Sequence, residues 1–391
     1  MTGAPATEPD GLAGLDVTKP GFFLRPDYIE LLAWLRSNAP LHRLDDGTVL
    51  VARYDDIREI SRQPELFSSR HGALVNDPVR RNGADDTTGS IIHLDPPIHA
   101  EWRRLVNREF TPRAAARFEP AIRTITDEVL DRLSPGDDID LVAEVASPIP
   151  VLVIAELLGI ADGDRDDFRR WSDAAITVFD FPTAETMATL TEMTSFLAEH
   201  IARRFDAPTD DLISVLATAE VDGRPLTLDQ VLMFCMTLLV AGNETTRSLI
   251  AGSVEVLAEH PDQRAALAAD LALVPAAIEE CVRWVTPIQA FCRTAMADTE
   301  VGGHPIAEGE YIALLYASGN RDEAAFGATA HRFDVRRPAT PAHVAFGFGE
   351  HLCLGAALAR LEGRIVLEQL LTRFPDWEII GAPTYAPSTL T

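Results

Sequence analysis

The stretch FGFGEHLCLG, residues 346–355, places one cysteine between a glycine-rich turn and the start of an alanine-rich helix. Glycines allow the backbone to fold tightly there and to aim N–H groups at the sulfur of Cys353. Amide donors and the N-terminus of the following helix, LGAALARLEGR, would stabilise a thiolate. The alternative is that Cys353 is a small buried hydrophobic residue, as free cysteines usually are.

The other three cysteines narrow what this sulfur could bind. Cys235, Cys281 and Cys292 show no CxxC spacing, either among themselves or with Cys353, so neither a disulfide framework nor a zinc site is indicated. We expect reduced thiols. A single thiolate is, however, a suitable axial ligand for haem iron.

The charge of the chain disfavours large anionic partners. Its 391 residues include 34 Lys and Arg against 60 Asp and Glu, a net charge of −26. This balance disfavours nucleic acid and the surface of anionic membranes, although it is compatible with a local basic patch. A hydrophobic share of 47% is ordinary for a globular protein with a sizeable core.

The N-terminus, MTGAPATEPDGLAG, has neither the basic start nor the apolar stretch of a signal peptide. The longest apolar run, residues 231–242, is too short to span a bilayer. We therefore expect a cytoplasmic, monomeric protein without a membrane anchor. We also expect a flexible segment over residues 1–20 and one domain over residues 21–391.

Helical periodicity dominates the rest of the chain. YIELLAWLR, residues 28–36, predicts an amphipathic helix, whereas TVLVARY, residues 48–54, predicts a strand. A second stretch rich in β signals covers residues 299–315. Residues 70–92 are rich in Gly, Asp, Asn and Arg and predict a long loop of functional importance. The pattern as a whole predicts a mainly α protein with small β-sheets (α+β).

The most informative helix begins within GRPLTLDQ. Thr227 and Gln230 fit a capping box, and only Gly242 and Gly252 interrupt the helical pattern before Pro261. About 30 residues would form a helix about 45 Å long, which must run through the core. Its centre, AGNETTRS, is polar, which is costly in a core unless the polar groups are paired or used. The alternative is a turn of the helix that faces solvent.

FGFGEHLCLG resembles the haem-binding signature of the cytochrome P-450 superfamily, the haem-thiolate monooxygenases, in its bacterial soluble form. Three further segments match in the order of the family. AGNETT resembles its oxygen-activating helix segment, residues 280–283 match its Glu-x-x-Arg pair, and HLDPPIHAEWRRL, residues 93–105, resembles the segment that reaches the haem carboxylates. The resemblance implies the cytochrome P-450 fold, with haem b (iron protoporphyrin IX) between the long central helix and the cysteine loop.

The resemblance also implies which residues hold the haem. Cys353 would bind the iron, and Phe346 would lie beside the sulfur and screen it from water. The two propionates would need cationic partners in a protein of this charge, and ordinary surface charges are the alternative for each candidate. The candidates are His99, Arg103, Arg293 and His351.

Glu280 and Arg283 are three residues apart on a predicted helix and form a natural ion pair. In the family this pair is structural and is joined by a further arginine, which here would be Arg332. Ala330 replaces the proline of that family motif. None of these residues is expected to be catalytic.

Glu244 and Thr245 are the expected catalytic residues. Oxygen activation requires protons to be delivered while bulk water is excluded, and an acid beside an alcohol can relay protons through ordered water. By resemblance, Thr245 would hydrogen-bond dioxygen and Glu244 would supply protons at a helix kink opened by Gly242. The small Ala241 and Gly242 would leave room for dioxygen.

The expected activity is hydroxylation of an unactivated C–H bond in a lipophilic molecule of steroid, fatty acid or terpenoid type, with O2 as oxidant. The expected pocket is apolar and partly aromatic, with Gln289 as an anchor for one polar end. Its expected lining is Phe179, Phe181, Val240, Ile288, Gln289 and Phe291. Alternatives are a tailoring oxidase of a polar polyketide or peptide intermediate, a peroxide-driven haem enzyme and a non-catalytic haem protein.

No reductase domain or flavin motif is present in the sequence, so a ferredoxin and a ferredoxin reductase are the expected electron donors. Four arginines flank the two haem-side segments and could form one basic patch for an acidic ferredoxin. They are Arg104, Arg108, Arg360 and Arg364. Solvated helix faces are the alternative.

Overall fold

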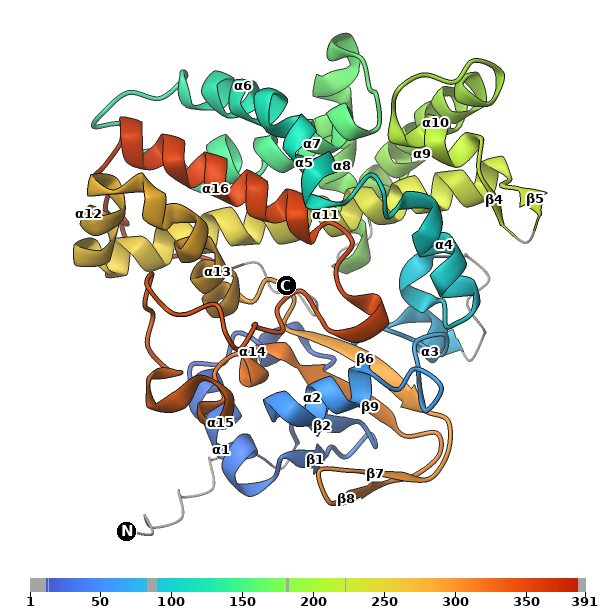
Figure 1. Cartoon of the computed structure of the whole chain (residues 1–391), viewed down its shortest axis with the longest axis vertical. Coiled ribbons are helices and arrows are strands. Elements are labelled where there is room, and N and C mark those ends of the chain that lie inside the picture. Colours follow the sequence, from blue (N-terminus) through green and yellow to red (C-terminus); the bar gives the residue numbers. More distant parts are fainter. Residues whose placement is uncertain (1–11, 13, 83–89, 181–182, 222, 386–391) are drawn as a thin grey trace.

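The computed structural model describes the chain except for residues 1–11, 13, 83–89, 181–182, 222 and 386–391. Helices form the larger part of the molecule, and a small sheet with its covering helices forms the rest (Figure 1). This arrangement confirms the predicted mainly α fold with small β-sheets.

The α-helices, in chain order, are α1 (Tyr28–Asn38), α2 (Tyr54–Ser61), α3 (Pro78–Asn82), α4 (Ile98–Val106), α5 (Pro112–Ala115), α6 (Glu119–Leu130), α7 (Pro148–Leu157), α8 (Arg165–Asp180), α9 (Ala184–Asp206), α10 (Leu212–Ala217), α11 (Leu228–Glu259), α12 (Pro261–Ala269), α13 (Val274–Val285), α14 (Tyr316–Gly319), α15 (Glu323–Phe326) and α16 (Ala356–Arg373). Within the part of the chain that the structure describes, none of the helices is both long enough and apolar enough to cross a membrane.

The strands are β1 (Leu41–Arg43), β2 (Val49–Val51), β3 (Phe67–Ser68), β4 (Glu220–Val221), β5 (Arg224–Pro225), β6 (Ala290–Ala295), β7 (Thr299–Val301), β8 (His304–Ile306) and β9 (Tyr311–Leu315). The predicted strand over residues 48–54 is the shorter β2, and the predicted β-rich stretch over residues 299–315 contains β7, β8 and β9.

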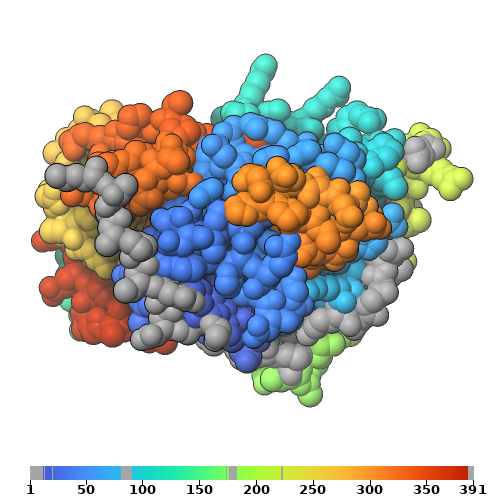
Figure 2. All heavy atoms as spheres, turned by 90° about the horizontal axis from the view of Figure 1, so that it is seen from below, coloured from blue at the N-terminus to red at the C-terminus, as the bar shows by residue number. Residues whose placement is uncertain are grey.

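The main sheet has five strands in the order β1-β2-β9-β6-β3. β2 and β9 pair in parallel, and the other neighbours pair antiparallel. All residues of β2 and β9 are buried, so the centre of the sheet is covered on both faces. The hairpin of β7 and β8 lies against the N-terminal part of the chain (Figure 2). This sheet holds β6, and with it Arg293, in a fixed position.

The long helix predicted from the sequence is α11, whose 32 residues run across the molecule (Figure 1). Its capping box is present, because the Thr227 N–H donates to Gln230 Oε1 (2.9 Å) and the Gln230 N–H donates to Thr227 Oγ1 (3.3 Å). The helix packs against α7, α9, α13 and α16. Asn243 and Thr246 at its polar centre are only 1% and 3% exposed, so this face of the helix does not meet solvent.

Part of the N-terminal segment that the sequence predicts to be flexible is packed in the core. Leu12, Leu15 and Val17 are buried in one cluster with Leu31 and Leu35 of α1. The expectation is wrong for these residues, because burial of their apolar side chains holds the segment against α1. Residues 1–11 and 13 lie outside the described residues, and for them flexibility stays a prediction.

The loop predicted over residues 70–92 is fastened to the main sheet near its start. The Cys292 N–H donates to the Ala73 carbonyl (2.7 Å), and the Tyr311 hydroxyl donates to the Leu74 carbonyl (2.7 Å). The loop then contains α3 and a short 3₁₀ helix over residues 91–93. The start of the loop is therefore held by β6, which also carries Arg293, and by β9.

Candidate active site

The loop that carries Cys353 is shaped by two glycines in the left-handed region. Gly347 and Gly349 have φ angles of 71° and 73°. A Cβ atom on Gly349 would lie 2.0 Å from the carbonyl oxygen of Ser61 at the end of α2, so no larger residue fits there. The Cys353 N–H donates to the Phe346 carbonyl (2.8 Å), which closes the loop just before α16 begins.

Cys353 is exposed, whereas the other three cysteines are buried. Its sulfur is thus accessible to a ligand, which excludes the alternative of a buried hydrophobic residue. Removal of hydration by the enclosing protein raises the pKa of the Cys353 thiol, while the Gly355 N–H and the charges of Arg103 and Arg360 act to lower it. These three groups thus offset part, but not all, of the cost that burial sets on a thiolate at Cys353.

The structure brings the four predicted propionate ligands together beside this loop. The rings of His99, from α4, and His351 lie 4.2 Å apart, centroid to centroid. Arg103, one turn along α4, donates to the Leu352 carbonyl (2.7 Å). Arg293 of β6 is 5% exposed, and its charge acts on both imidazoles.

Protonation of the His99 and His351 imidazoles is strongly disfavoured. Burial, together with neighbouring positive charges, lowers the pKa of His99 to about 4 and that of His351 to about 3. The opposing acids are Glu350 and Asp95, and the Asp95 carboxylate already accepts hydrogen bonds from Ser68 Oγ (2.5 Å) and the Ser69 N–H (2.8 Å). With both imidazoles neutral, the charged groups of the cluster are Arg103 and Arg293 against Glu350 and Asp95, and both arginines act to lower the pKa of the two imidazoles.

The groups of this cluster test whether a haem fits the site. Buried cations need anionic partners, and the two propionates of a haem would supply them. His99, Glu350 and His351 also offer ligand atoms within 4.8 Å of one another, but the adjacent guanidinium of Arg103 disfavours a metal cation there. The residues present thus fit the carboxylates of a haem whose iron is bound by Cys353.

Two residues of this cluster were not found by sequence reasoning. Ser69 Oγ lies 3.2 Å from His351 Nε2, and Glu350 Oε1 lies 3.5 Å from the same nitrogen. Glu350 could have been noticed because it stands beside His351 in the signature. Ser69 is far from it in the sequence and gives no such signal.

Glu244 and Thr245 lie next to each other in the middle of α11. Thr245 Oγ1 donates to the carbonyl of Ala241 (2.6 Å), and Glu244 pairs with Arg247. α11 is α-helical over its whole length, Gly242 included, and the kink expected at this residue stays a prediction.

Gly242 has a different role from the one expected. A Cβ atom at this position would lie 2.8 Å from Cδ1 of Ile154, so the missing side chain lets α7 pack closely against α11. Ala241, in contrast, is exposed and remains a candidate for the small residue beside dioxygen.

The Glu-x-x-Arg pair is buried and forms a network, but its third member differs from the expected one. Arg283 donates to Glu280 through Nε and Nη2, each at 2.7 Å. The side chain that joins them is Arg337, whose Nε lies 3.0 and 3.1 Å from the two Glu280 oxygens. Arg332 contributes its carbonyl, and its side chain is exposed. The assignment of Arg332 is wrong because the loop after α15 turns so that the later arginine faces Glu280.

The predicted pocket residues fall into three groups. Val240, Ile288 and Phe291 are partly buried and pack against apolar clusters, as a pocket wall requires. Gln289 differs, because its amide donates to the Thr286 carbonyl (2.8 Å) and accepts from the Tyr28 hydroxyl (3.4 Å). Its amide is thus used within the protein, which removes the reason for placing a substrate anchor there. Phe181 and the side chain of Phe179 lie outside the described residues.

The four arginines of the expected basic patch are not equivalent. Arg104 and Arg108 are exposed on or just after α4. Arg360 instead binds Glu279 through Nε (2.5 Å) and Nη2 (3.0 Å), and Arg364 binds Glu119 (2.8 Å). The positive charge of the last two is locally neutralised, so the patch is smaller than the sequence suggests.

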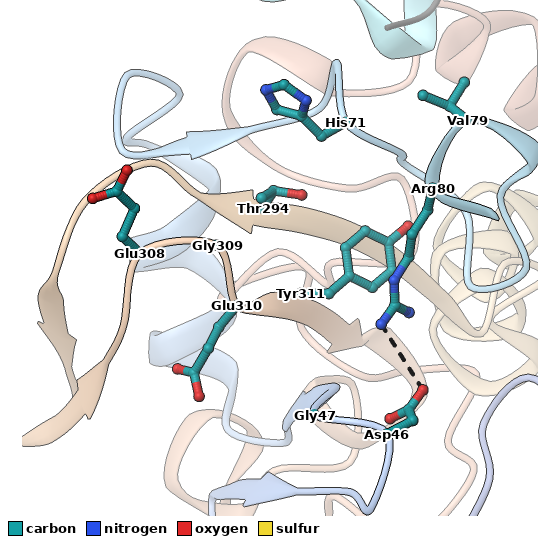
Figure 3. Close-up of a pocket in the computed structure, with 10 residues that line it drawn as sticks. All are labelled: Asp46, Gly47, His71, Val79, Arg80, Thr294, Glu308, Gly309, Glu310 and Tyr311. Carbon is teal, nitrogen blue, oxygen red and sulfur yellow. Dashed lines mark ion pairs between the residues drawn. The ribbon is translucent and has the colours of Figure 1, made fainter. Parts of the chain in front are cut away.

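A separate hollow of about 650 Å³ lies at the rim of the main sheet (Figure 3). There the Arg80 guanidinium lies over the Tyr311 ring (3.9 Å to its centroid) and 3.9 Å from the Asp46 carboxylate. None of the individually named site residues lines this hollow, but His71, Val79 and Arg80 of the loop over residues 70–92 do.

Known proteins resemble this chain in sequence and in structure. Residues 181–381 match the family Cytochrome P450. The chain is 35% identical over 378 residues to the steroid C26-monooxygenase of Mycobacterium tuberculosis (strain ATCC 25618 / H37Rv), across 95% of this chain and 92% of that protein. Cytochrome P450 CYP109Q5 from Chondromyces apiculatus superposes with a TM-score of 0.85 at 40% identity, across 96% of this chain and 95% of that one. A mutant of P450 EryK from S. erythraea, in complex with erythromycin B, superposes with a TM-score of 0.79 at 36% identity, across 89% and 88%.

These similarities extend over most of the chain and include the cysteine loop, the long helix and the Glu-x-x-Arg pair. Membership of this family implies a haem-thiolate cofactor, which agrees with the exposed Cys353 and with the arginines and imidazoles gathered beside it. The chain belongs to the cytochrome P450 family and is a P450 monooxygenase.

Proposed function

We propose that this P450 binds haem b through Cys353 and hydroxylates an unactivated C–H bond of a lipophilic small molecule of steroid, fatty acid or terpenoid type. The observation that carries the cofactor assignment is the exposed Cys353 beside a cluster that contains Arg103, Arg293 and two neutral imidazoles. The propionates would be held by His99, Arg103, Arg293 and His351. Thiolate-bound haem supplies the oxygen chemistry of such an enzyme, because the sulfur donates electron density that favours O–O cleavage.

The side chains of α11 would move the protons. Thr245 donates its hydroxyl proton to the Ala241 carbonyl (2.6 Å), so its oxygen lone pairs are free to accept a hydrogen bond from water. Glu244 is oriented by Arg247, and their side chains keep 13% and 22% of their surface exposed. The carboxylate can therefore exchange protons with water while its position stays fixed, which is what a relay requires.

The substrate class is inferred from the pocket wall and from one relative. Val240, Ile288 and Phe291 are apolar, and with Gln289 bound internally the described wall offers little to orient a polar substrate. Apolar burial contributes about 25 cal/mol per Å², so a large hydrocarbon skeleton gains most from such a wall. The similarity to a protein named steroid C26-monooxygenase supports the same class.

A second candidate is the tailoring of a polar natural product, and one observation favours it. The similar EryK structure holds erythromycin B. Polar groups for such a substrate would have to come from the loop over residues 70–92, part of which lies outside the described residues.

Titration of the substrate-free holoprotein with a steroid, a fatty acid and a macrolactone separates the two candidates. Displacement of water by a seated substrate shifts the haem absorption band toward the high-spin form. We expect this shift with a lipid at a lower concentration than with the macrolactone. A clear shift with the macrolactone and none with either lipid would contradict the lipid assignment.

Electrons would come from a ferredoxin and its reductase. The exposed Arg104 and Arg108 provide positive charge on the α4 side of the cysteine loop, where an acidic ferredoxin would dock with salt-dependent affinity.

A further inference from the structure

The ring of Phe346, beside Cys353 in the loop, is flanked by two cationic or titratable side chains. The guanidinium carbon of Arg360, from α16, lies 4.5 Å from the ring centroid. The ring of His343 lies 5.5 Å from the same centroid. Because the Phe346 carbonyl accepts the Cys353 N–H (2.8 Å), the position of Phe346 is coupled directly to that of the cysteine backbone.

One carboxylate holds both flanking side chains. Glu279, from α13, accepts two hydrogen bonds from Arg360 (2.5 and 3.0 Å), and its Oε2 lies 3.4 Å from His343 Nε2. His343 Nδ1 accepts the Ala345 N–H (3.3 Å), so the other ring nitrogen, Nε2, is the one that lies near Glu279. Burial alone would raise the pKa of Glu279, but His343 and Arg360 lower it to about 2, and the group is anionic at neutral pH.

We propose that Glu279 is a positioning residue that sets the electrostatic potential at the Cys353 sulfur by holding Arg360 and His343 against Phe346. The charge of Arg360 acts on Cys353 in the direction that favours its thiolate. Glu279 fixes that charge in place and partly cancels it. This inference rests on the proposed haem-thiolate site, since it concerns the potential felt by the ligand of the iron.

Two substitutions give effects of opposite sign. Glu279→Gln removes a negative charge, so the added electron of the reduced haem is favoured and the reduction potential rises. Arg360→Gln removes a positive charge, so the potential falls. We expect each to change the ferric–ferrous equilibrium constant by about threefold, because partial exposure screens both groups. A tenfold change corresponds to 59 mV for one electron.

A purely structural role predicts something else. If the cluster only packed Phe346, both variants would loosen the ring, admit water to the sulfur and shift the potential in the same direction. Arg360→Lys adds a second test, because lysine keeps the charge without the planar stack or the two-pronged contact. The reduction potential of Arg360→Lys should lie closer to the wild-type value than that of Arg360→Gln.

Glu119→Gln is the matched control. Glu119 binds Arg364, one turn further along α16 (2.8 Å), and also accepts two hydrogen bonds from Arg123 of α6 (2.7 and 3.0 Å). Loss of this pair should leave the potential unchanged, since no contact links Arg364 with Phe346 among the described residues.

The experiment is a redox titration of the substrate-free holoprotein and its four variants, with the spectrum of the reduced carbon-monoxide complex recorded for each. Opposite shifts for Glu279→Gln and Arg360→Gln support the inference, and shifts of the same sign or no shifts overturn it. If Glu279→Gln does not bind haem, the comparison of Arg360→Gln with Arg360→Lys tests the inference instead. Equal reduction potentials for these two variants would overturn the inference. A wild type without the thiolate spectrum would instead contradict the proposed function.

Discussion

Replacing Glu280 with glutamine should destabilise the protein more than replacing Arg337 or Arg332 of its network. The Glu280 carboxylate accepts hydrogen bonds from Arg283 (2.7 and 2.7 Å), Arg337 (3.0 and 3.1 Å) and the Asp334 N–H (2.9 Å). Glutamine keeps the shape but turns an NH2 group toward these donors. It also leaves the charge of Arg283, whose side chain is 2% exposed, without a counter-charge.

Removing one partner of a buried ion pair costs about 3–5 kcal/mol, out of a total stability of about 5–15 kcal/mol. We expect a loss in this range for Glu280→Gln. Arg337→Met leaves the Glu280–Arg283 pair in place and removes charged hydrogen bonds, so it should cost about 1.5–3 kcal/mol. The free energy of unfolding of Arg332→Met should stay within about 0.5 kcal/mol of the wild-type value. The Arg332 side chain is exposed, and the group that accepts a hydrogen bond from Arg283 is the main-chain carbonyl of Arg332, which the substitution leaves in place.

Urea unfolding, followed by far-UV circular dichroism at matched haem content, measures these differences from the midpoints and slopes. The matched pair Arg332→Met and Arg337→Met tests which arginine completes the network. Equal losses for the two, or a loss below about 1 kcal/mol for Glu280→Gln, would contradict the network described here.

Thr245→Ala should still bind substrate and accept electrons, but it should divert them into peroxide and water, and a wild-type yield of product per electron would remove Thr245 from the proton relay. Arg108→Glu should slow reduction by an acidic ferredoxin at low salt, with a smaller effect at high salt; an unchanged rate at low salt counts against docking there. Burial, and after it the charge of His351, lowers the pKa of His99 from 6.5 to about 4. His99 therefore binds a proton more tightly in the unfolded chain than in the folded protein. The apoprotein should therefore lose stability as the pH falls from about 6.5 to about 4, and His99→Gln should make this loss smaller. Unfolding midpoints measured across this pH range test the prediction. An equal loss of stability in the variant would contradict the lowered pKa of His99.

Local signals in the sequence were sufficient for the elements that hold the site. The capping residues Thr227 and Gln230 lie within one turn of each other, so the start of α11 could be predicted from sequence spacing alone. The cysteine loop was predictable for the same reason, because its glycines, His351 and Cys353 act within ten residues.

Residues whose role depends on a distant partner could not be placed in this way. Gln289 looked like a pocket residue, but its amide is engaged by Tyr28, 261 positions away in the sequence. The choice between Arg332 and Arg337 depends on how an irregular loop turns, and such a loop has no periodicity to read. Gly242 likewise looked like space for a ligand, whereas the close approach of Ile154 explains it.

The central claim, that the Cys353 sulfur is the axial ligand of a haem, is tested most directly by the absorption spectrum of the reduced carbon-monoxide complex. The wild type should show the band characteristic of thiolate ligation. Cys353→His should retain some haem, since the proposed carboxylate ligands His99, Arg103, Arg293 and His351 are unchanged, but should lose that band. An undiminished band in Cys353→His would show that another group binds the iron.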